Sequence, residues 1–274
     1  MFNNEVVVIT GGSSGLGLAL AHKFVAAGAS VALVARDTVK LAAAEQDLAA
    51  QLQSSQRVMS FACDVACSES CERVMESIAG ALGAPTLLIN SAGILHEGYF
   101  EQLSPEIWRS IIDINLMGTV NTSRAILPYF ARRGGGRIVN VASLAGKFGT
   151  FGYTAYCASK HAVVGFTECL RLELGPRNIK VQLVCPGEFD TPMVEGIAGS
   201  RTPENKALTH TVPPMSLAAV TDETFAGIVK GTYLIIPGWI GRCLYRLGRW
   251  APGLVSWIMD RQLKAVYRGP SHRQ

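Results

Sequence analysis

Apolar residues follow two spacings along the chain, and the two alternate. Short segments rich in β-branched residues have the length of buried strands, and longer segments carry apolar residues at helical spacing. The segments that predict strands are Val6–Ile9, Val31–Val34, Arg57–Phe61, Thr86–Ile89, Arg137–Val141, Ile179–Val184 and Tyr233–Ile236. The segments that predict helices are Leu16–Ala27, Ala42–Leu52, Glu69–Leu82, Gly118–Arg132 and Thr154–Leu174, with two more that begin at Ser104-Pro105 and lie near Thr224.

This alternation predicts the fold class. Strand–helix–strand units place parallel strands side by side and cover both faces of the sheet with helices. We therefore expect an α/β fold, with a single Rossmann-type, doubly wound parallel sheet of about seven strands and helices on both faces. No repeat or low-complexity linker divides residues 1–236, so we expect one domain there and an appended tail over residues 237–274. Residues 186–220 are rich in Pro, Gly and Thr and predict a long loop that covers a binding site.

Composition and charge narrow the class of protein. Hydrophobic residues make up 49% of the 274 residues and charged residues 17%, which excludes a disordered chain. The net charge is +4, but residues 231–274 hold seven basic residues and one acid, so the remaining chain is slightly acidic and is not expected to bind nucleic acid. Seven scattered cysteines predict reduced thiols and a cytoplasmic protein, and no Cys/His spacing predicts a metal site. We expect no signal peptide, and the apolar runs are shorter than the roughly 20 residues that span a membrane.

A glycine-rich turn separates the first predicted strand from the first predicted helix. Glycines let the backbone turn sharply and approach a ligand, and the N-terminus of the following helix favours a phosphate. The turn therefore predicts a dinucleotide site within the domain of residues 1–236. Its candidate residues are Thr10, Gly11, Ser13, Ser14, Gly15, Leu16 and Gly17. The alternative is a purely structural turn.

The same turn also matches the Gly-x-Ser-x-Gly pattern of a hydrolase nucleophile, with Ser13 as the nucleophile. Two features disfavour this alternative. A nucleophile on the first strand leaves no upstream strand to supply the second oxyanion-hole donor, and Gly17 would have no role.

The residues after the second predicted strand favour NADP(H) over NAD. Sites for NAD carry an acid near this point, whereas this chain has Ala35 followed by Arg36, and a guanidinium suits a 2′-phosphate. Asp64, next to Val65 after the third strand, is a candidate partner of the adenine. The alternatives are a surface arginine beside Asp37 as a helix N-cap, and Asp64 as the N-cap of the next helix.

Several polar residues are expected at the carboxyl edge of the sheet. Tyr156 and Lys160 are four residues apart and share one helix face, and Ser143 follows the fifth strand. An ammonium beside a phenol favours the phenolate; lowering the phenol pKa from about 10 to about 7 corresponds to about 4 kcal/mol. This combination predicts proton transfer at a substrate oxygen by Tyr156. Taken alone, such a Tyr/Lys pair is usually a surface pair.

Together these motifs resemble, in order, those of the short-chain dehydrogenase/reductase family. The motifs are Thr10–Gly17, Asn90-Ser91-Ala92-Gly93, Asn115, Ser143, Tyr156 with Lys160, and Pro186-Gly187. The resemblance covers residues 5–236 and implies a carbonyl reductase that uses NADP(H). It implies that Tyr156 protonates the carbonyl oxygen, Ser143 positions it, and Lys160 lowers the tyrosine pKa and holds the nicotinamide ribose.

The resemblance also implies the roles of the remaining motifs. Asn115 anchors a water of the proton relay, and Asn90, Ala92 and Gly93 support the central strand and the ribose, with Ser91 where the family usually has Asn. Pro186 and Gly187 belong to the coenzyme site. Relatives pair the helices Gly118–Arg132 and Thr154–Leu174 across subunits, which implies a homodimer or homotetramer.

A narrower resemblance concerns the substrate. The segments 146–156, 189–192 and 202–208 look like those of 3-ketodihydrosphingosine reductases, which use NADPH to reduce the ketone of a long-chain base. The N-terminal membrane anchor of the eukaryotic members is not expected here. The general expectation is a bulky apolar or lipid-like ketone. The alternatives are oxidation of a hydroxysteroid-like or other bulky alcohol, and a catalytically silent nucleotide-binding protein.

The tail combines basic and aromatic residues. Three of the four tryptophans lie in it, and the apolar residues Val255, Ile258, Met259, Leu263 and Val266 share one helix face. A basic amphipathic helix of this kind predicts peripheral contact with an anionic membrane surface. The alternative is that the same face packs on the loop over the site or on a partner subunit.

Overall fold

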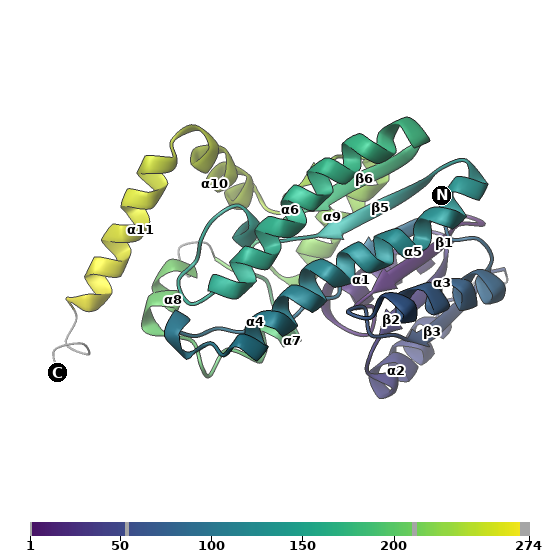
Figure 1. Ribbon diagram of the computed structural model, residues 1–274, viewed down its shortest axis with the longest axis horizontal. Coiled ribbons are helices and arrows are strands. Elements are labelled where there is room, and N and C mark those ends of the chain that lie inside the picture. The colour runs from purple at the N-terminus through teal and green to yellow at the C-terminus, as the bar shows by residue number, and fades with distance from the viewer. Residues whose placement is uncertain (1, 53–54, 210–212, 269–274) are drawn as a thin grey trace.

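The centre of the protein is a parallel sheet with helices on both faces (Figure 1). The computed structural model describes residues 2–52, 55–209 and 213–268. The strand order is β3-β2-β1-β4-β5-β6-β7, and all neighbouring strands run parallel. The strands are β1 (Val6–Thr10), β2 (Ser30–Ala35), β3 (Val58–Ala62), β4 (Leu87–Asn90), β5 (Gly136–Val141), β6 (Ile179–Val184) and β7 (Leu234–Ile235). The predicted seven-stranded, doubly wound sheet is confirmed.

Successive residues of β1 supply the two apolar layers. Val7 and Ile9 pack with the helices of one face, whereas Val6 and Val8 pack with those of the other, because neighbouring side chains of a strand point in opposite directions. The first layer involves α1 (Gly15–Ala26), α2 (Thr38–Ala49) and α9 (Leu217–Lys230). The second involves α3 (Ser68–Leu82), α5 (Gly118–Arg133) and the end of α6 (Thr154–Leu174).

Helix starts follow local capping. The helix α4 (Pro105–Ile112) begins where expected, since the Ser104 hydroxyl accepts a hydrogen bond from the Ile107 amide. The helix α2 begins at Thr38, not at Ala42. The Asp37 carboxylate accepts hydrogen bonds from two amides of the first turn and so starts the helix earlier than the apolar pattern suggested.

The segment after β6 contains two short helices, which corrects the prediction of a long loop over residues 186–220; residues 210–212 of that range lie outside the described residues. These are α7 (Pro192–Glu195), capped by the Thr191 hydroxyl, and α8 (Pro203–Thr209). Both begin at a proline, a residue that the first helical position tolerates well because its missing N–H is not needed there. We call residues 187–209 the cover segment.

The C-terminal residues form two helices at one end of the molecule, α10 (Trp239–Trp250) and α11 (Pro252–Tyr267), which lie beside each other and beyond α8 (Figure 1). The helix α11 contacts α8, and Val255, Ile258 and Met259 on its inner face line the cavity described below. The predicted apolar face of the tail is thus turned toward the cover segment and cavity, not outward. In the described ranges, no helix combines the length and apolar character that crossing a membrane requires.

Candidate active site

One cavity of about 400 Å³ joins the glycine-rich turn, the predicted catalytic residues and the tail. It opens along the carboxyl ends of the strands, where ligands of doubly wound sheets bind. Gly11, Ser14, Gly15 and Leu16 line one part, and Ser143, Tyr156 and Lys160 line the centre. The far part has a mostly apolar wall from the two tail helices, formed by Leu244, Leu247, Val255, Ile258 and Met259 with one polar residue, Gln262.

The glycine-rich turn is shaped for close approach of a phosphate. Gly11 and Gly15 have φ angles of +66° and +53°, which side chains other than glycine rarely adopt. A Cβ on Gly17 would lie 2.3 Å from the Gly11 carbonyl oxygen, so only glycine lets α1 start this close to the turn. The Ser14 side chain does not cap α1, and the first turn of α1 contains no acid. A free, positively polarised helix end beside the cavity fits a dinucleotide's pyrophosphate.

The three central side chains come from two neighbouring elements. Tyr156 and Lys160 lie on the first turns of α6, and Ser143 follows β5. The Lys160 Nζ donates to the Val141 carbonyl at 3.0 Å and lies 5.7 Å from the centre of the Tyr156 ring. The Ser143 Oγ accepts from the Ala145 amide at 3.1 Å, which fixes its position at the end of the strand. The structure thus brings together the groups that the sequence grouped.

The pKa of Tyr156 departs from the expectation. Burial raises the pKa of the Tyr156 phenol above its ordinary value, and a hydrogen bond with Ser143 acts in the opposite direction. The expected lowering of the Tyr156 pKa is therefore wrong, because burial has the larger effect. Burial also lowers the pKa of Lys160 to about 8, because no carboxylate of the described residues offsets the loss of water around its ammonium. A phenol with a raised pKa stays protonated at neutral pH, which suits a proton donor.

Asn115 lies behind the centre, in a π-helical segment between α4 and α5. Its Oδ1 accepts from the Ile94 amide at 2.8 Å, and its Nδ2 donates to the Ile94 carbonyl and to the Ser159 hydroxyl, both at 3.0 Å. These bonds tie the segment after β4 to α6. π-Helical turns are often found at functional sites. The role of Asn115 in a water relay stays a prediction.

Two residues predicted to bind the coenzyme, Thr10 and Asn90, use their side chains for hydrogen bonds within the protein. The Thr10 Oγ1 accepts from the amides of Ser91 and Ala92 at 3.1 and 3.2 Å. The Asn90 side chain is buried between β4, β5 and α5, where it donates to Asn140 and Ser123 and accepts from Thr122. Both side chains thus hold the strand ends in register. Ser91 and Gly93 line the cavity, whereas Ala92 holds this segment through its amide.

Arg36 and Asp64, the residues expected to determine coenzyme specificity, are not among the residues that line the cavity. Arg36 is exposed at the end of β2, and Asp37 is an N-cap, as the alternative expectation had it. The Asp64 carboxylate accepts from the Ala66 amide at 3.0 Å. Cys67, not Asp64, is the N-cap of α3, so the expectation of Asp64 as that N-cap is wrong.

The remaining predicted residues differ in whether they line the cavity. Val65 is buried against Gly118, where a Cβ would lie 2.6 Å from it. Pro186 and Gly187 line the cavity, and the Pro186 carbonyl accepts from the Leu144 amide at 2.8 Å. Ser13 is not among the lining residues, and within the described residues no hydrogen bond joins it to a histidine or an acid. That arrangement does not support a hydrolase.

The sequence analysis missed three polar side chains of the site. Tyr153 and Glu188 line the cavity, and Arg201 pairs with Glu188 behind it. Tyr153 lies three residues before Tyr156, and Glu188 directly follows the predicted Pro186-Gly187. Their closeness in sequence to predicted site residues could have indicated both. Nothing in the sequence indicated that Arg201 would reach them.

Comparison with known proteins identifies the family. The family model described as short chain dehydrogenase matches residues 5–201. The chain belongs to the short-chain dehydrogenase family. This membership makes the protein an oxidoreductase that uses a nicotinamide dinucleotide, which rules out the hydrolase alternative.

Curated proteins similar to this chain include mouse 3-ketodihydrosphingosine reductase, which is 33% identical over 229 residues, covering 83% of this chain and 69% of the mouse protein. A zebrafish 3-dehydrosphinganine reductase is 38% identical over 192 residues, covering 69% of this chain and 58% of that protein. The chain thus spans only part of each relative's length. A solved short-chain dehydrogenase from Sphingobium yanoikuyae, in complex with NADPH, is 30% identical with a TM-score of 0.77 and covers 92% of this chain and 95% of its own.

Proposed function

We propose that the protein uses NADPH to reduce a ketone carried on a long apolar chain. One observation carries the proposal: a single cavity runs from the glycine-rich turn past Tyr156 to a wall of apolar side chains on α10 and α11. A coenzyme, a proton donor and an apolar chain can therefore share one space. A bulky secondary alcohol oxidised with NAD(P) is the second candidate, because the same groups serve the reverse reaction.

The chain's own residues handle the carbonyl oxygen. When bound, the nicotinamide supplies the hydride to the carbonyl carbon. Tyr156 donates the proton that the oxygen gains, and its raised pKa keeps this proton in place until then. The Ser143 hydroxyl orients the oxygen. The ammonium of Lys160, 5.7 Å from the Tyr156 ring, stabilises the phenolate that the transfer leaves behind.

The far wall of the cavity supports a lipid-like substrate. Its leucine, valine, isoleucine and methionine side chains offer no charge, and Lys160 and Glu188 are the charged residues of the described lining. An alkyl chain gains about 0.8 kcal/mol for each CH₂ group buried in such surroundings. The mouse relative is a 3-ketodihydrosphingosine reductase. We therefore propose a 3-keto long-chain base as the first substrate to test.

Oxidation of NADPH, followed by its absorbance, tests the function. Ketones of graded chain length are offered, with 3-ketodihydrosphingosine among them. We expect kcat/KM to rise with chain length until the apolar wall is filled. A rate that is the same for short and long ketones contradicts the lipid-like substrate, and no turnover of any ketone contradicts reduction altogether. The corresponding alcohols, offered with NADP⁺, measure the rate of the reverse reaction.

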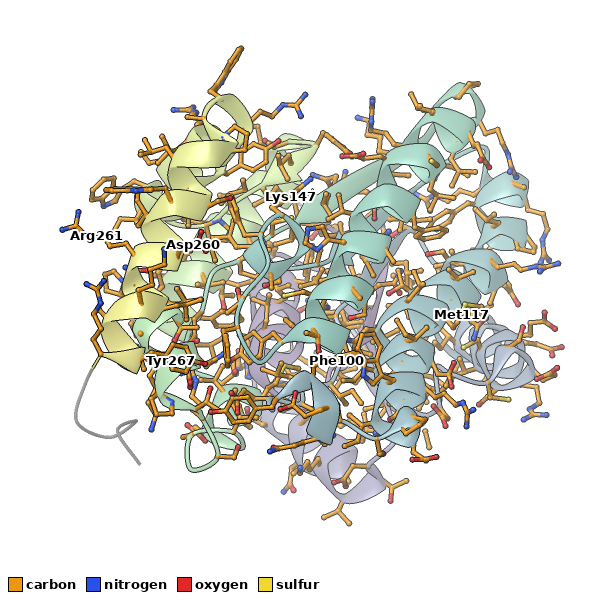
Figure 2. All side chains as sticks on the ribbon, turned by 60° about the vertical axis from the view of Figure 1, so that its left-hand side comes forward. Phe100, Met117, Lys147, Asp260, Arg261 and Tyr267 are labelled. Carbon is orange, nitrogen blue, oxygen red and sulfur yellow. The ribbon has the colours of Figure 1, made fainter. Side chains whose placement is uncertain are left out.

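We further propose that the outer side of the tail rests on an anionic membrane surface. Trp250 and Trp257 are 86% and 55% exposed, and the Arg261 guanidinium lies 5.4 Å from the centre of the Trp257 ring. Figure 2 shows Arg261 on the outer side of α11. Exposed tryptophans among basic side chains are typical of helices that lie in a membrane interface. Such contact would bring the cavity close to a lipid-like substrate.

Vesicle binding tests this contact. The double variant Trp250→Ser/Trp257→Ser is expected to lose sedimentation with phosphatidylserine vesicles, and neutral vesicles are expected to bind the wild type weakly. Phe100→Ser removes an aromatic side chain that is 66% exposed outside the tail, and it serves as the matched control. Equal sedimentation of the double variant and wild type contradicts the proposal without bearing on the chemistry.

A further inference from the structure

A second phenol stands beside the proton donor. Tyr153 precedes α6, is 6% exposed and lines the cavity. Its ring meets the Tyr156 ring edge to face, with 5.8 Å between the ring centres. The two hydroxyl-bearing side chains therefore flank the same part of the cavity. The mechanism proposed above uses Tyr156 and leaves Tyr153 without a role.

The Tyr153 hydroxyl has one free bonding capacity. Its oxygen accepts a hydrogen bond from the Arg201 Nη2 at 3.1 Å. The Asn205 side chain also forms a hydrogen bond with Tyr153 that lowers its pKa, so it too donates to the phenol oxygen. A phenol can also donate one hydrogen bond, and among the residues that the structure describes no hydrogen bond uses the Tyr153 proton. Burial raises the pKa of Tyr153, so the hydroxyl keeps its proton at neutral pH. A buried donor without an acceptor costs free energy, which an acceptor on a bound ligand would recover.

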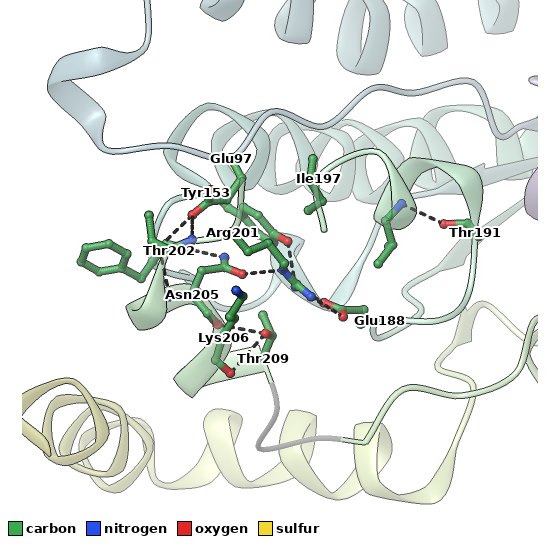
Figure 3. A network of polar contacts seen from close by, with 12 residues as sticks. Glu97, Tyr153, Glu188, Thr191, Ile197, Arg201, Thr202, Asn205, Lys206 and Thr209 are labelled. Carbon is green, nitrogen blue, oxygen red and sulfur yellow. Dashed lines mark hydrogen bonds and ion pairs between the residues drawn. The ribbon is translucent and has the colours of Figure 1, made fainter. Parts of the chain in front are cut away.

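Arg201 is held so firmly that it fixes this hydroxyl (Figure 3). Its guanidinium binds the Glu188 carboxylate with two hydrogen bonds, of which the Nη1–Oε1 bond is 2.8 Å long. Its Nε donates to the Asn205 Oδ1 at 2.9 Å, and the Asn205 Nδ2 donates to the Phe151 carbonyl at 2.7 Å. A planar, bidentate pair of this kind has one orientation. The cover segment is thereby tied to the residues just before α6.

Tyr153 shares the cavity lining with several apolar side chains. These include Leu95, Phe148, Met193 and Val194. Ser143, Tyr156 and Lys160 are assigned to the reacting carbonyl, so Tyr153 is a separate fixed donor, and such a donor discriminates between a ligand that carries a second acceptor and one that lacks it.

We infer that Tyr153 is a second hydrogen-bond donor of the substrate site and binds an oxygen that the substrate carries a few bonds from the reacting carbonyl. Ketones with a nearby hydroxyl are the class this subsite selects. Arg201 is a positioning residue, which acts by holding the Tyr153 hydroxyl in place. The inference rests on the proposed reduction at Tyr156 and adds the substrate's second polar group to it.

Two ketones of equal chain length test the inference: a long-chain 3-ketone with a hydroxyl on C1, and the same ketone without it. The measured quantity is the ratio of their kcat/KM values. Tyr153→Phe is expected to lower this ratio about 5–10-fold, the effect of losing one neutral hydrogen bond, and to do so mainly through KM. Tyr99→Phe is the matched control. It removes a hydroxyl that contacts Glu204 on the cover segment but does not line the cavity.

Arg201→Met is expected to lower the ratio as Tyr153→Phe does, and Arg201→Lys to lower it less. An unchanged ratio in Tyr153→Phe, or an equal fall in Tyr99→Phe, overturns the inference. Dissociation constants of both ketones for the coenzyme-loaded protein give the same ratio without turnover. If neither ketone is reduced but Tyr153→Phe still weakens binding of the hydroxyketone selectively, the reduction fails and the subsite stands.

Discussion

The Lys160 ammonium group donates to the Val141 carbonyl at 3.0 Å, so the end of β5 fixes the distance between this charge and the Tyr156 ring. The lysine is 5% exposed, and in the part of the chain that the structure describes no carboxylate offsets its burial. Burying the charged ammonium therefore costs desolvation free energy. The binding of a negatively charged coenzyme, or the formation of a phenolate at Tyr156, would offset this cost.

Coenzyme binding should depend on the charge of Lys160. Because the pKa of Lys160 is lowered to about 8, we expect the NADPH dissociation constant to be constant from pH 7 to 7.5 and to rise above pH 8. Quenching of tryptophan fluorescence measures it. Burial raises the pKa of the neighbouring Cys185 to about 11, so that thiol stays neutral over this range. Lys160→Met should bind NADPH weakly, with a dissociation constant that does not change near pH 8. A wild-type dissociation constant that is independent of pH would contradict the expectation.

The same lowered pKa makes a prediction about stability. The unfolded chain holds the lysine proton up to its ordinary pKa of 10.5, whereas the folded chain releases it near 8. Between these values the unfolded state binds more protons, so this group makes the free energy of unfolding rise with pH. Urea unfolding of wild type and Lys160→Met at pH 7.5 and 9.5 measures the difference. The prediction is contradicted if the free energy of unfolding rises more between these pH values in Lys160→Met than in wild type.

Tyr156→Phe should abolish reduction while NADPH still binds. The change removes the proton donor but keeps the ring, and general acid catalysis contributes about 10²–10⁴-fold. The measurement is single-turnover NADPH oxidation alongside a binding titration. Ser143→Ala should lower the rate by a smaller factor, because the Tyr156 proton remains. Turnover by Tyr156→Phe at the wild-type rate would show that another group donates the proton.

Arg36→Ala should weaken NADPH binding much more than NADH binding. We propose that the exposed guanidinium at the end of β2 meets the 2′-phosphate, and a charge-assisted pair of this kind contributes about 1.5–3 kcal/mol. Kinetics with both coenzymes give the selectivity. Lys40→Ala removes a nearby exposed cation that pairs with Asp37 and is the matched control. Equal losses for the two coenzymes would exclude a role for Arg36 in recognising the phosphate.

The sequence predicted the sheet and the grouping of Ser143, Tyr156 and Lys160, because strand ends of a parallel sheet meet at one edge whatever the loops do. It did not predict the environment of Tyr156. The raised pKa of that phenol results from burial, to which distant segments contribute, and no local pattern reports it. Likewise, the apolar spacing of α11 was visible, but whether Val255 and Met259 face a membrane or a cavity depends on where α8 lies. Arg201 reaches Tyr153 across 48 residues, a contact that spacing cannot reveal.

Gly17→Ala should destabilise the glycine-rich turn. The added Cβ would lie 2.3 Å from the Gly11 carbonyl oxygen, so the start of α1 must shift, at a cost of about 1–3 kcal/mol, and phosphate binding should weaken with it. Thermal unfolding with and without NADPH measures both effects. Gly80→Ala is the control: it lies in α3, where the new Cβ would meet no atom within 4 Å outside its chain neighbours and the nearby helix backbone, and alanine should stabilise that helix by about 1 kcal/mol. An unchanged Tm in Gly17→Ala would mean that the turn accommodates the methyl group.

Met259→Trp should shorten the chain that the cavity accepts. Met259 lies on the inner face of α11 and lines the far wall, and the larger indole fills space that we assign to the end of an alkyl chain. We expect kcat/KM for long ketones to fall by about tenfold or more, because the indole would exclude about two CH₂ groups of the substrate chain from the apolar wall. Short ketones should keep their rate. Ser256→Trp places the same side chain at an exposed position of α11 and should leave the chain-length profile unchanged. If Met259→Trp lowers the rates of short and long ketones alike, the tail wall does not hold the substrate chain, and α10 and α11 serve only to cover the site.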